Sequence, residues 1–190
     1  MSHLSLAQRD LWIIAVLNSA AAWWYSWRTA QHGKDEALRF FTDFVSDFPI
    51  PRPNDEQRSR AVQIVEALVA SRATQHDTSA TLLDWLRVEH EIEKPSQRLQ
   101  GFLALDSDGF AAEVKKIRGR KAPLTAAGVK SLRDEFVRTV EPAKRLAAEA
   151  IQMEREVGDL VIAAYGLTPA EIDLMWETAP PRMPIPRTRP

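Results

Sequence analysis

Apolar and polar residues follow helical periods along most of the chain. Residues 11–25 hold thirteen apolar residues in fifteen, which predicts a helix from about Leu6 to Arg28 that is buried on more than one side. A second, short helix is predicted over Asp35 to Val45, and the polar residues 70–81 are expected to form a loop. No stretch alternates convincingly as a strand would, so the pattern predicts an all-α protein.

Prolines and polar residues mark where the helices begin and end. Three prolines within residues 49–53 predict an extended segment, because each fixes its own φ angle and disfavours α conformation in the residue before it. Side chains that can bond the first backbone N–H groups of a helix predict the starts, and glycine predicts a stop. The predicted starts are Asn54 with Gln57, Thr81 with Asp84, Asp106 with Ser107, and Thr168 with Glu171, and the predicted stop is Gly166.

The longest regular segment is predicted over Thr125 to Ala164. From Ala143 onward its apolar residues alternate at spacings of three and four, as in a coiled-coil seam, and Pro142 predicts a kink. We therefore expect an elongated helical bundle with two long antiparallel helices and an extended C-terminal tail rich in proline and arginine. The expected parts are an N-terminal region over 1–53, a helical domain over 54–179 and a basic tail over 180–190.

Composition limits the possible binding partners and cellular locations of the chain. The net charge of −1 means that any contact with nucleic acid must come from local patches. The chain has no cysteine, which excludes disulfides and thiolate metal sites and fits a cytoplasmic location. The apolar run at 11–25 is shorter than a membrane span, which needs roughly 20 residues, so a buried helix is favoured over a signal peptide or a membrane helix.

Catalytic motifs are not found in the sequence. No glycine-rich nucleotide loop and no polar-Pro-Pro-aromatic loop is present, so no cofactor or catalytic residue is expected in this chain. The weakest hypothesis is a metal-dependent nuclease that uses Asp108, Glu113 and Lys115, although these residues lie in a helical pattern. The four histidines lack metal-site spacing, so we expect them at the surface and expect no metal.

Residues 115–121 place five cations within seven positions. Such cations neutralise phosphates and give salt-sensitive affinity for DNA, but a solvated helix end, whose carbonyl dipole favours cations, would look the same. The candidate DNA-binding residues are Lys115, Lys116, Arg118, Arg120 and Lys121. The arginines of the tail are weaker candidates, and the tryptophans of residues 12–27 are expected to pack in a core or against a partner.

Short motifs along nearly the whole chain resemble one family. In the first half these are Leu17-Asn18-Ser19, Trp23-Trp24-Tyr25, Arg39-Phe40-Phe41, Phe48-Pro49-Ile50-Pro51 and Asp55-Glu56-Gln57. In the second half they are Leu83-Asp84-Trp85-Leu86, Glu93-Lys94-Pro95-Ser96, Leu105-Asp106-Ser107-Asp108, Ala164-Tyr165-Gly166-Leu167 and Trp176-Glu177-Thr178. Together they resemble the end of the target-recognition region and the tail of the TaqI-like adenine-N6 DNA methyltransferases and of the fused type IIG restriction-modification enzymes.

The resemblance implies a role in DNA recognition without catalysis. In the family a methyltransferase domain precedes this region, whereas here Met1 stands just before the first helix. We therefore expect double-stranded DNA and a separately encoded methyltransferase chain as partners, with S-adenosylmethionine bound by that chain and no contact with a membrane. Asn18, Pro49 and Pro51 are expected to be structural. The alternatives are a gene fragment and a helical protein–protein interaction subunit with no role on nucleic acid.

Overall fold

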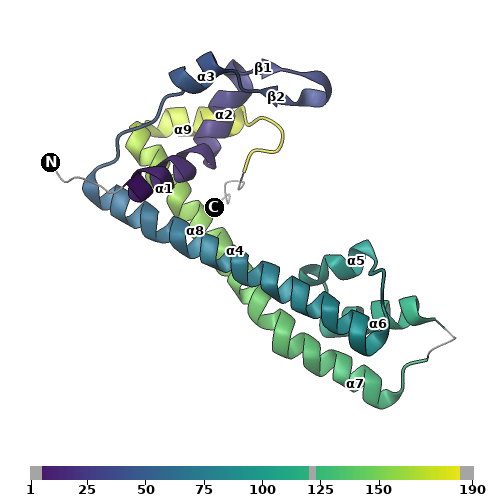
Figure 1. The fold of residues 1–190 in the computed structure, drawn as a ribbon. Coiled ribbons are helices and arrows are strands. Elements are labelled where there is room, and N and C mark those ends of the chain that lie inside the picture. The colour runs from purple at the N-terminus through teal and green to yellow at the C-terminus, as the bar shows by residue number, and fades with distance from the viewer. Residues whose placement is uncertain (1–5, 120–122, 185–190) are drawn as a thin grey trace. The chain divides into compact units, whose positions relative to one another are not determined.

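The computed structural model describes residues 6–119 and 123–184 and is all-α apart from one small hairpin (Figure 1). The described chain forms two compact units. We call the residues up to Leu68 together with those from Ile151 onward the terminal unit, and Val69–Ala150 the middle unit. The long helices α4 (Asp55–His90) and α8 (Glu141–Tyr165) each contribute to both units. No helix among the described residues is long and apolar enough to cross a membrane.

The terminal unit begins with two helices where one was predicted. Helix α1 (Leu6–Leu17) ends at Asn18, whose side-chain amide donates to the carbonyl of Ile14. The hydroxyl of Ser19 then caps α2 (Ala20–Thr29) by accepting from the N–H of Ala22 at 3.1 Å. The prediction of one helix was wrong because apolar residues continue on both sides of these two capping side chains. The Leu-Asn-Ser motif is thus a corner between two helices.

A hairpin and a short helix replace the helix predicted over residues 35–45. Strands β1 (Gln31–His32) and β2 (Leu38–Arg39) pair antiparallel around a short 3-10 turn, η1 (Lys34–Glu36). Asp35 and Glu36 adopt positive φ angles in that turn, which ends a regular helix there. Helix α3 (Thr42–Asp47) follows and leads into the extended proline segment.

The proline segment is fixed by two side chains of the terminal unit. Tyr165 donates its hydroxyl to the carbonyl of Pro49 at 2.7 Å, and the indole of Trp12 donates to the carbonyl of Pro51 at 3.1 Å. Prolines have no N–H, so the segment can offer only acceptors at these positions. Burial raises the pKa of Tyr165 to about 12, and nearby Tyr25 also raises it.

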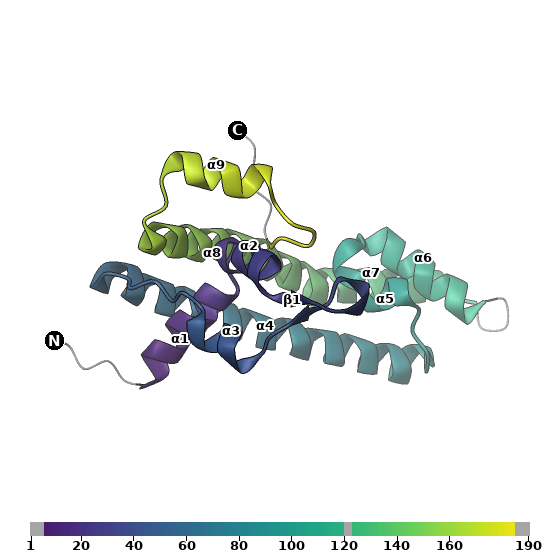
Figure 2. The ribbon, with the colours of Figure 1, turned by 90° about the horizontal axis from the view of Figure 1, so that it is seen from above.

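The core of the terminal unit lies where α1 packs on the first part of α4 and the last part of α8. Those parts run antiparallel (Figure 1), and Arg60 binds Glu156 across them at 2.5 Å. Helix α8 stops before Gly166, as predicted, and this glycine adopts a φ of +70°; α9 (Pro169–Glu177) then folds back beside α8 (Figure 2). The buried cluster consists of Trp12, Ala15, Val16, Ala61, Ile64, Val65, Val157 and Val161.

The middle unit contains the helix that corrects the predicted loop at 70–81. Helix α4 runs through this stretch unbroken, because polar side chains do not end a helix and there is no glycine or proline between residues 54 and 94. The helix ends at His90, where Glu91 takes a φ of +55° and the N–H of Ile92 bonds the carbonyl of Leu86. After it come α5 (Gln97–Gln100), the 3-10 turn η2 (Phe102–Ala104), α6 (Ser107–Arg118) and α7 (Ala126–Glu135).

A π-helical turn, η3 (Phe136–Val140), stands where the kink at Pro142 was predicted. The N–H of Glu141 bonds the carbonyl of Phe136, five residues back, so the backbone widens just before the proline. The wider turn accommodates the missing N–H of Pro142 without ending the helical path. The core of the middle unit consists of Leu82, Leu86, Ile92, Leu99, Phe102, Leu105, Phe110, Ala111, Val114, Leu132, Phe136 and Val140.

Candidate functional site

The candidate DNA-binding cations lie at the C-terminal end of α6. Asp106 starts this helix by accepting from the N–H of Gly109 at 2.7 Å, as predicted. Lys115 and Lys116 are exposed in the last turn. Gly119 ends the helix with a φ of +63° and donates to the carbonyl of Lys115. Of the five candidates, Arg120 and Lys121 lie outside the described residues.

The three described cations differ in what they bind. Lys116 lies 4.0 Å from Glu113, whose side chain is 6% exposed and accepts a hydrogen bond from Ser96. Arg118 contacts Nδ1 of His90 at 3.3 Å. For Lys115 no ion pair with another described residue is found, and this leaves Lys115 the most available of the three for an external anion.

His90 is buried, contrary to the expectation that the histidines lie at the surface. Only 7% of the residue is exposed, and its ring lies edge-on to Trp85 with centroids 4.6 Å apart. Since a guanidinium can only donate, Nδ1 of His90 accepts from Arg118 and the ring proton belongs on Nε2. Burial lowers the pKa of His90 below its ordinary value of 6.5, Arg118 lowers it further, and Glu89 opposes the shift.

The buried ring predicts a loss of stability in mild acid. A base whose pKa is lowered by folding stabilises the protein above its unfolded pKa, and this contribution is lost as the pH falls below about 6.5 toward the folded value. We expect the urea midpoint to fall between pH 7 and pH 5, and to fall less in His90→Asn, whose amide oxygen can replace Nδ1. Equal pH profiles for the two proteins would contradict a role for His90.

The residues of the nuclease hypothesis are engaged elsewhere. Asp108 is exposed and binds Arg133 at 2.7 Å. The carboxylate of Glu113 is buried beside Ser96, the residue that caps α5. In the described part of the chain, no group of three or more His, Cys, Asp or Glu side chains is placed to hold a metal ion. Glu113 therefore has a structural explanation that needs no metal.

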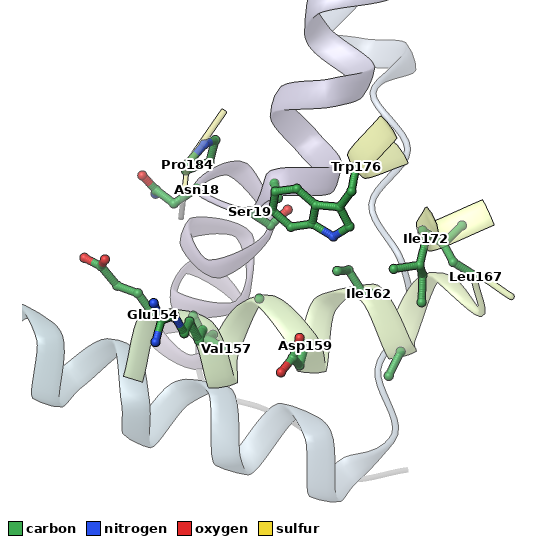
Figure 3. Close-up of a pocket in the computed structure, with 14 residues that line it drawn as sticks. Asn18, Ser19, Glu154, Val157, Asp159, Ile162, Leu167, Ile172, Trp176 and Pro184 are labelled. Carbon is green, nitrogen blue, oxygen red and sulfur yellow. The ribbon is translucent and has the colours of Figure 1, made fainter. Parts of the chain in front are cut away.

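A cavity of about 550 Å³ opens in the terminal unit between the α1–α2 corner, α8 and α9 (Figure 3). Asn18 and Ser19 line it from the corner, and the indole of Trp176 reaches it from α9. The sequence did not point to this cavity, because it forms only when α9 folds back after Gly166. The other lining residues are Ala20, Glu154, Arg155, Val157, Gly158, Asp159, Ile162, Ala163, Leu167, Ile172 and Pro184.

Large apolar side chains are exposed mainly in the N-terminal fifty residues. Of the twelve that are most exposed in the described structure, seven lie there, and Phe40 and Phe41 are each 54% exposed. The ring of Phe40 contacts Phe44 with centroids 5.2 Å apart, and Phe44 contacts Phe48 at 5.8 Å. We call these seven side chains the N-terminal apolar surface: Ile13, Ile14, Leu17, Phe40, Phe41, Val45 and Ile50.

The tryptophans of α2 bind the C-terminal segment. The indole of Trp23 donates to the carbonyl of Pro181 at 2.9 Å, and that of Trp24 donates to the hydroxyl of Thr178 at 3.1 Å. Arg28 stacks on Trp24 and donates to the carbonyl of Thr178 at 2.8 Å. These contacts confirm that the tryptophans have a packing role. Residues 180–184 form no helix or strand, and the tail arginines beyond them, Arg187 and Arg189, lie outside the described residues.

Comparison with known proteins identifies one family. A model of the family described as a domain of unknown function, DUF8810, matches residues 54–161, from just before α4 to the last turns of α8. Neither the curated proteins nor the solved structures contain a match to the chain. The matched region covers more than half of the 190 residues and includes the whole middle unit with Lys115, Lys116 and Arg118. The chain therefore belongs to the DUF8810 family.

Proposed function

We propose that this chain is a DNA-contact subunit of an adenine-specific DNA methyltransferase of the restriction-modification type. It would dock on a separately encoded catalytic chain, which binds S-adenosylmethionine. The observation that carries the proposal is that seven exposed large apolar side chains lie in the first fifty residues, since exposed apolar side chains that gather in one patch mark interaction sites. The same fifty residues hold the Leu17-Asn18-Ser19 and Phe48-Pro49-Ile50-Pro51 motifs, which in the resembled family belong to the recognition region.

The cations at the end of α6 support the contact with DNA. Lys115 and Lys116 are exposed next to Gly119, where the absence of a side chain allows phosphate to approach the backbone. The middle unit carries fourteen Lys and Arg against twelve Asp and Glu, a net charge of +2, although the chain as a whole has −1. Sequence-independent affinity for duplex DNA is what such a patch provides.

DNA binding should depend on salt through these lysines. Each neutralised phosphate releases condensed counterions and contributes about −0.9 to the slope of log K against log salt. We expect the double variant Lys115→Ala, Lys116→Ala to bind duplex DNA more weakly, with a slope shallower by about 2, as measured by fluorescence anisotropy from low to physiological salt. The matched control is Lys34→Ala with Arg52→Ala, two exposed cations of the terminal unit. Equal slopes in the two variants would contradict the assignment of the site.

Docking on a catalytic chain should depend on the N-terminal apolar surface. We expect the protein to co-purify with the methyltransferase chain encoded beside it, and the pair alone to methylate adenine in duplex DNA. Replacing Phe40 and Phe41 by serine should abolish co-purification, whereas Val69→Ser with Val88→Ser should not, although both valines are 59% exposed. A neighbouring gene without a methyltransferase, or a pair that does not methylate, would overturn the proposal.

A second candidate is a helical interaction subunit with no role on nucleic acid. The contacts that Lys116 and Arg118 make with Glu113 and His90 favour it, because they give two of the three described cations a role within the fold. Assembly through Phe40 and Phe41 without measurable affinity for duplex DNA would support this candidate. Salt-dependent binding that is lost with Lys115 and Lys116 would exclude it.

A further inference from the structure

The cavity beside Trp176 is used by neither the proposed DNA contact nor the proposed docking surface. All of its lining residues belong to the terminal unit, between the α1–α2 corner, α8 and α9 (Figure 3). Its volume of about 550 Å³ lies within the usual range of small-molecule sites, roughly 300–1,000 Å³. The cavity therefore has the size of a ligand site, and its lining decides which chemistry it would take.

One part of the lining offers a cation that needs an acceptor. Arg155 lines the cavity, and its Nε is buried with no hydrogen-bond partner among the described residues. A guanidinium keeps its proton at any ordinary pH, so burial cannot neutralise it as it would a lysine. The buried Nε has no surface that a ligand in the cavity could reach, so a ligand would bind the Nη groups of the guanidinium. A carboxylate is the acceptor that these groups favour.

Acceptors lie in the same lining, among them the carboxylates of Glu154 and Asp159 and the amide of Asn18. Asp159 is exposed, and the described structure gives it no ion pair. The amide nitrogen of Asn18 donates to the carbonyl of Ile14 at 2.9 Å, which leaves its Oδ1 as an acceptor. A cationic or amine donor in the ligand would bind a carboxylate of this lining, so the polar lining offers charges of both signs.

The remaining walls are apolar. Ile162, Leu167 and Ile172 lie together on the side of α9, and the indole of Trp176 stands between them and Asn18 (Figure 3). Aliphatic and aromatic walls next to a few polar groups are typical of sites that bind an apolar body and orient it by its polar end. The cavity thus combines an apolar half with a polar half of mixed charge.

We propose that this cavity binds a small amphiphilic zwitterion with the size and chemistry of a free apolar amino acid. Its carboxylate binds the guanidinium of Arg155, and its ammonium group binds the carboxylate of Asp159. Its side chain packs on Trp176 and the aliphatic wall of α8 and α9. Binding of this kind joins three segments of the terminal unit, so it stabilises the placement of α9 against the α1–α2 corner.

Calorimetric titration of the full chain with L-leucine and L-phenylalanine tests the proposal. We expect millimolar or tighter binding for at least one of them, and about 10- to 100-fold weaker binding in Arg155→Gln, because a hydrogen bond to a charged group is lost. A substitution at Gly158 can block the cavity without removing a polar group, since a Cβ built on Gly158 would meet nothing within 4 Å. Gly158→Leu should therefore fold and fill the cavity, whereas Gly158→Ala should fold and still bind.

Three outcomes would overturn the proposal. They are the absence of heat with both amino acids, binding that survives Gly158→Leu, and N-acetylated amino acids that bind as tightly as the free ones. Thermal melting of both glycine variants shows that they are folded, because replacing a helical glycine by a residue with a side chain is expected to raise stability. Duplex binding and co-purification do not enter this test, so its result is independent of the proposed function.

Discussion

Replacing Phe136 by alanine is expected to lower the free energy of unfolding by about 3–5 kcal/mol, as found when a large aromatic side chain is removed from a packed core. Phe136 is fully buried in the middle unit, and its ring contacts that of Phe110 with centroids 5.3 Å apart. It also belongs to the π-helical turn that joins α7 to α8. The urea midpoint and slope measure the loss.

The neighbouring residue provides the control for Phe136. Val137 lies in the same turn but is 57% exposed, so Val137→Ala should change stability by no more than about 0.5 kcal/mol. Equal urea midpoints for Phe136→Ala and Val137→Ala would contradict a buried position for Phe136. A double variant, Phe110→Ala with Phe136→Ala, tests the contact between the rings. Stability losses of residues in contact do not add, so a double loss equal to the sum of the two single losses would contradict this contact.

The second large effect is expected at Trp12. This side chain is 5% exposed in the core of the terminal unit, and its indole N–H binds the carbonyl of Pro51. Trp12→Ala should cost about 3–5 kcal/mol through the lost packing and the unpaired carbonyl. Differential scanning calorimetry of the variant gives the change in melting temperature and enthalpy.

Trp12→Phe separates packing from hydrogen bonding. Phenylalanine retains most of the apolar contact but has no donor for Pro51, so its cost should lie near that of one hydrogen bond, about 0.5–1.5 kcal/mol, plus a small loss of area. Ile13→Ala is the control in the same helix, since Ile13 is 39% exposed. A Trp12→Ala variant as stable as Ile13→Ala would rule out a core position for Trp12.

Helix ends with side-chain caps were predictable from the sequence because capping is local chemistry. Asn54 and Gln57 bond each other's backbone N–H groups as expected, and Thr168 and Glu171 form the same reciprocal arrangement. Asp106 and Gly166 also act where they were predicted to. Each of these features involves residues no more than four positions apart, so no knowledge of the fold was needed.

Three predictions of where helices begin or end were wrong, because the pattern of apolar and polar residues did not show where the helices break. The polar stretch at 70–81 remains helical because it holds no glycine or proline, and Thr74 and Gln75 bond within the helix. The corner at Asn18 was hidden because the apolar run continues across it on both sides. The helix start predicted at Thr81 was also wrong, because α4 runs through this position without a break.

For the candidate sites, too, local features could be predicted from the sequence, whereas features that depend on the fold could not. The exposure of Lys115 and Lys116 follows from their place in the last turn of an amphipathic helix, and so it could be predicted. The burial of His90 could not, because Trp85 and Arg118 reach it from one turn earlier and from another helix. The cavity also required the fold, since Asn18, Arg155 and Trp176 are brought together only by the return of α9.

The π-helical turn before Pro142 gives the chain a local tolerance in length. Because η3 holds one residue more than an α-helical turn would, deleting a residue between Phe136 and Val140 could restore regular α geometry instead of breaking the helix. The later side chains of α8, such as that of buried Ala143, would keep nearly the same faces, because the wider turn already takes up the extra residue. The turn thus takes up one residue of sequence and keeps the two halves of one continuous helical path in phase.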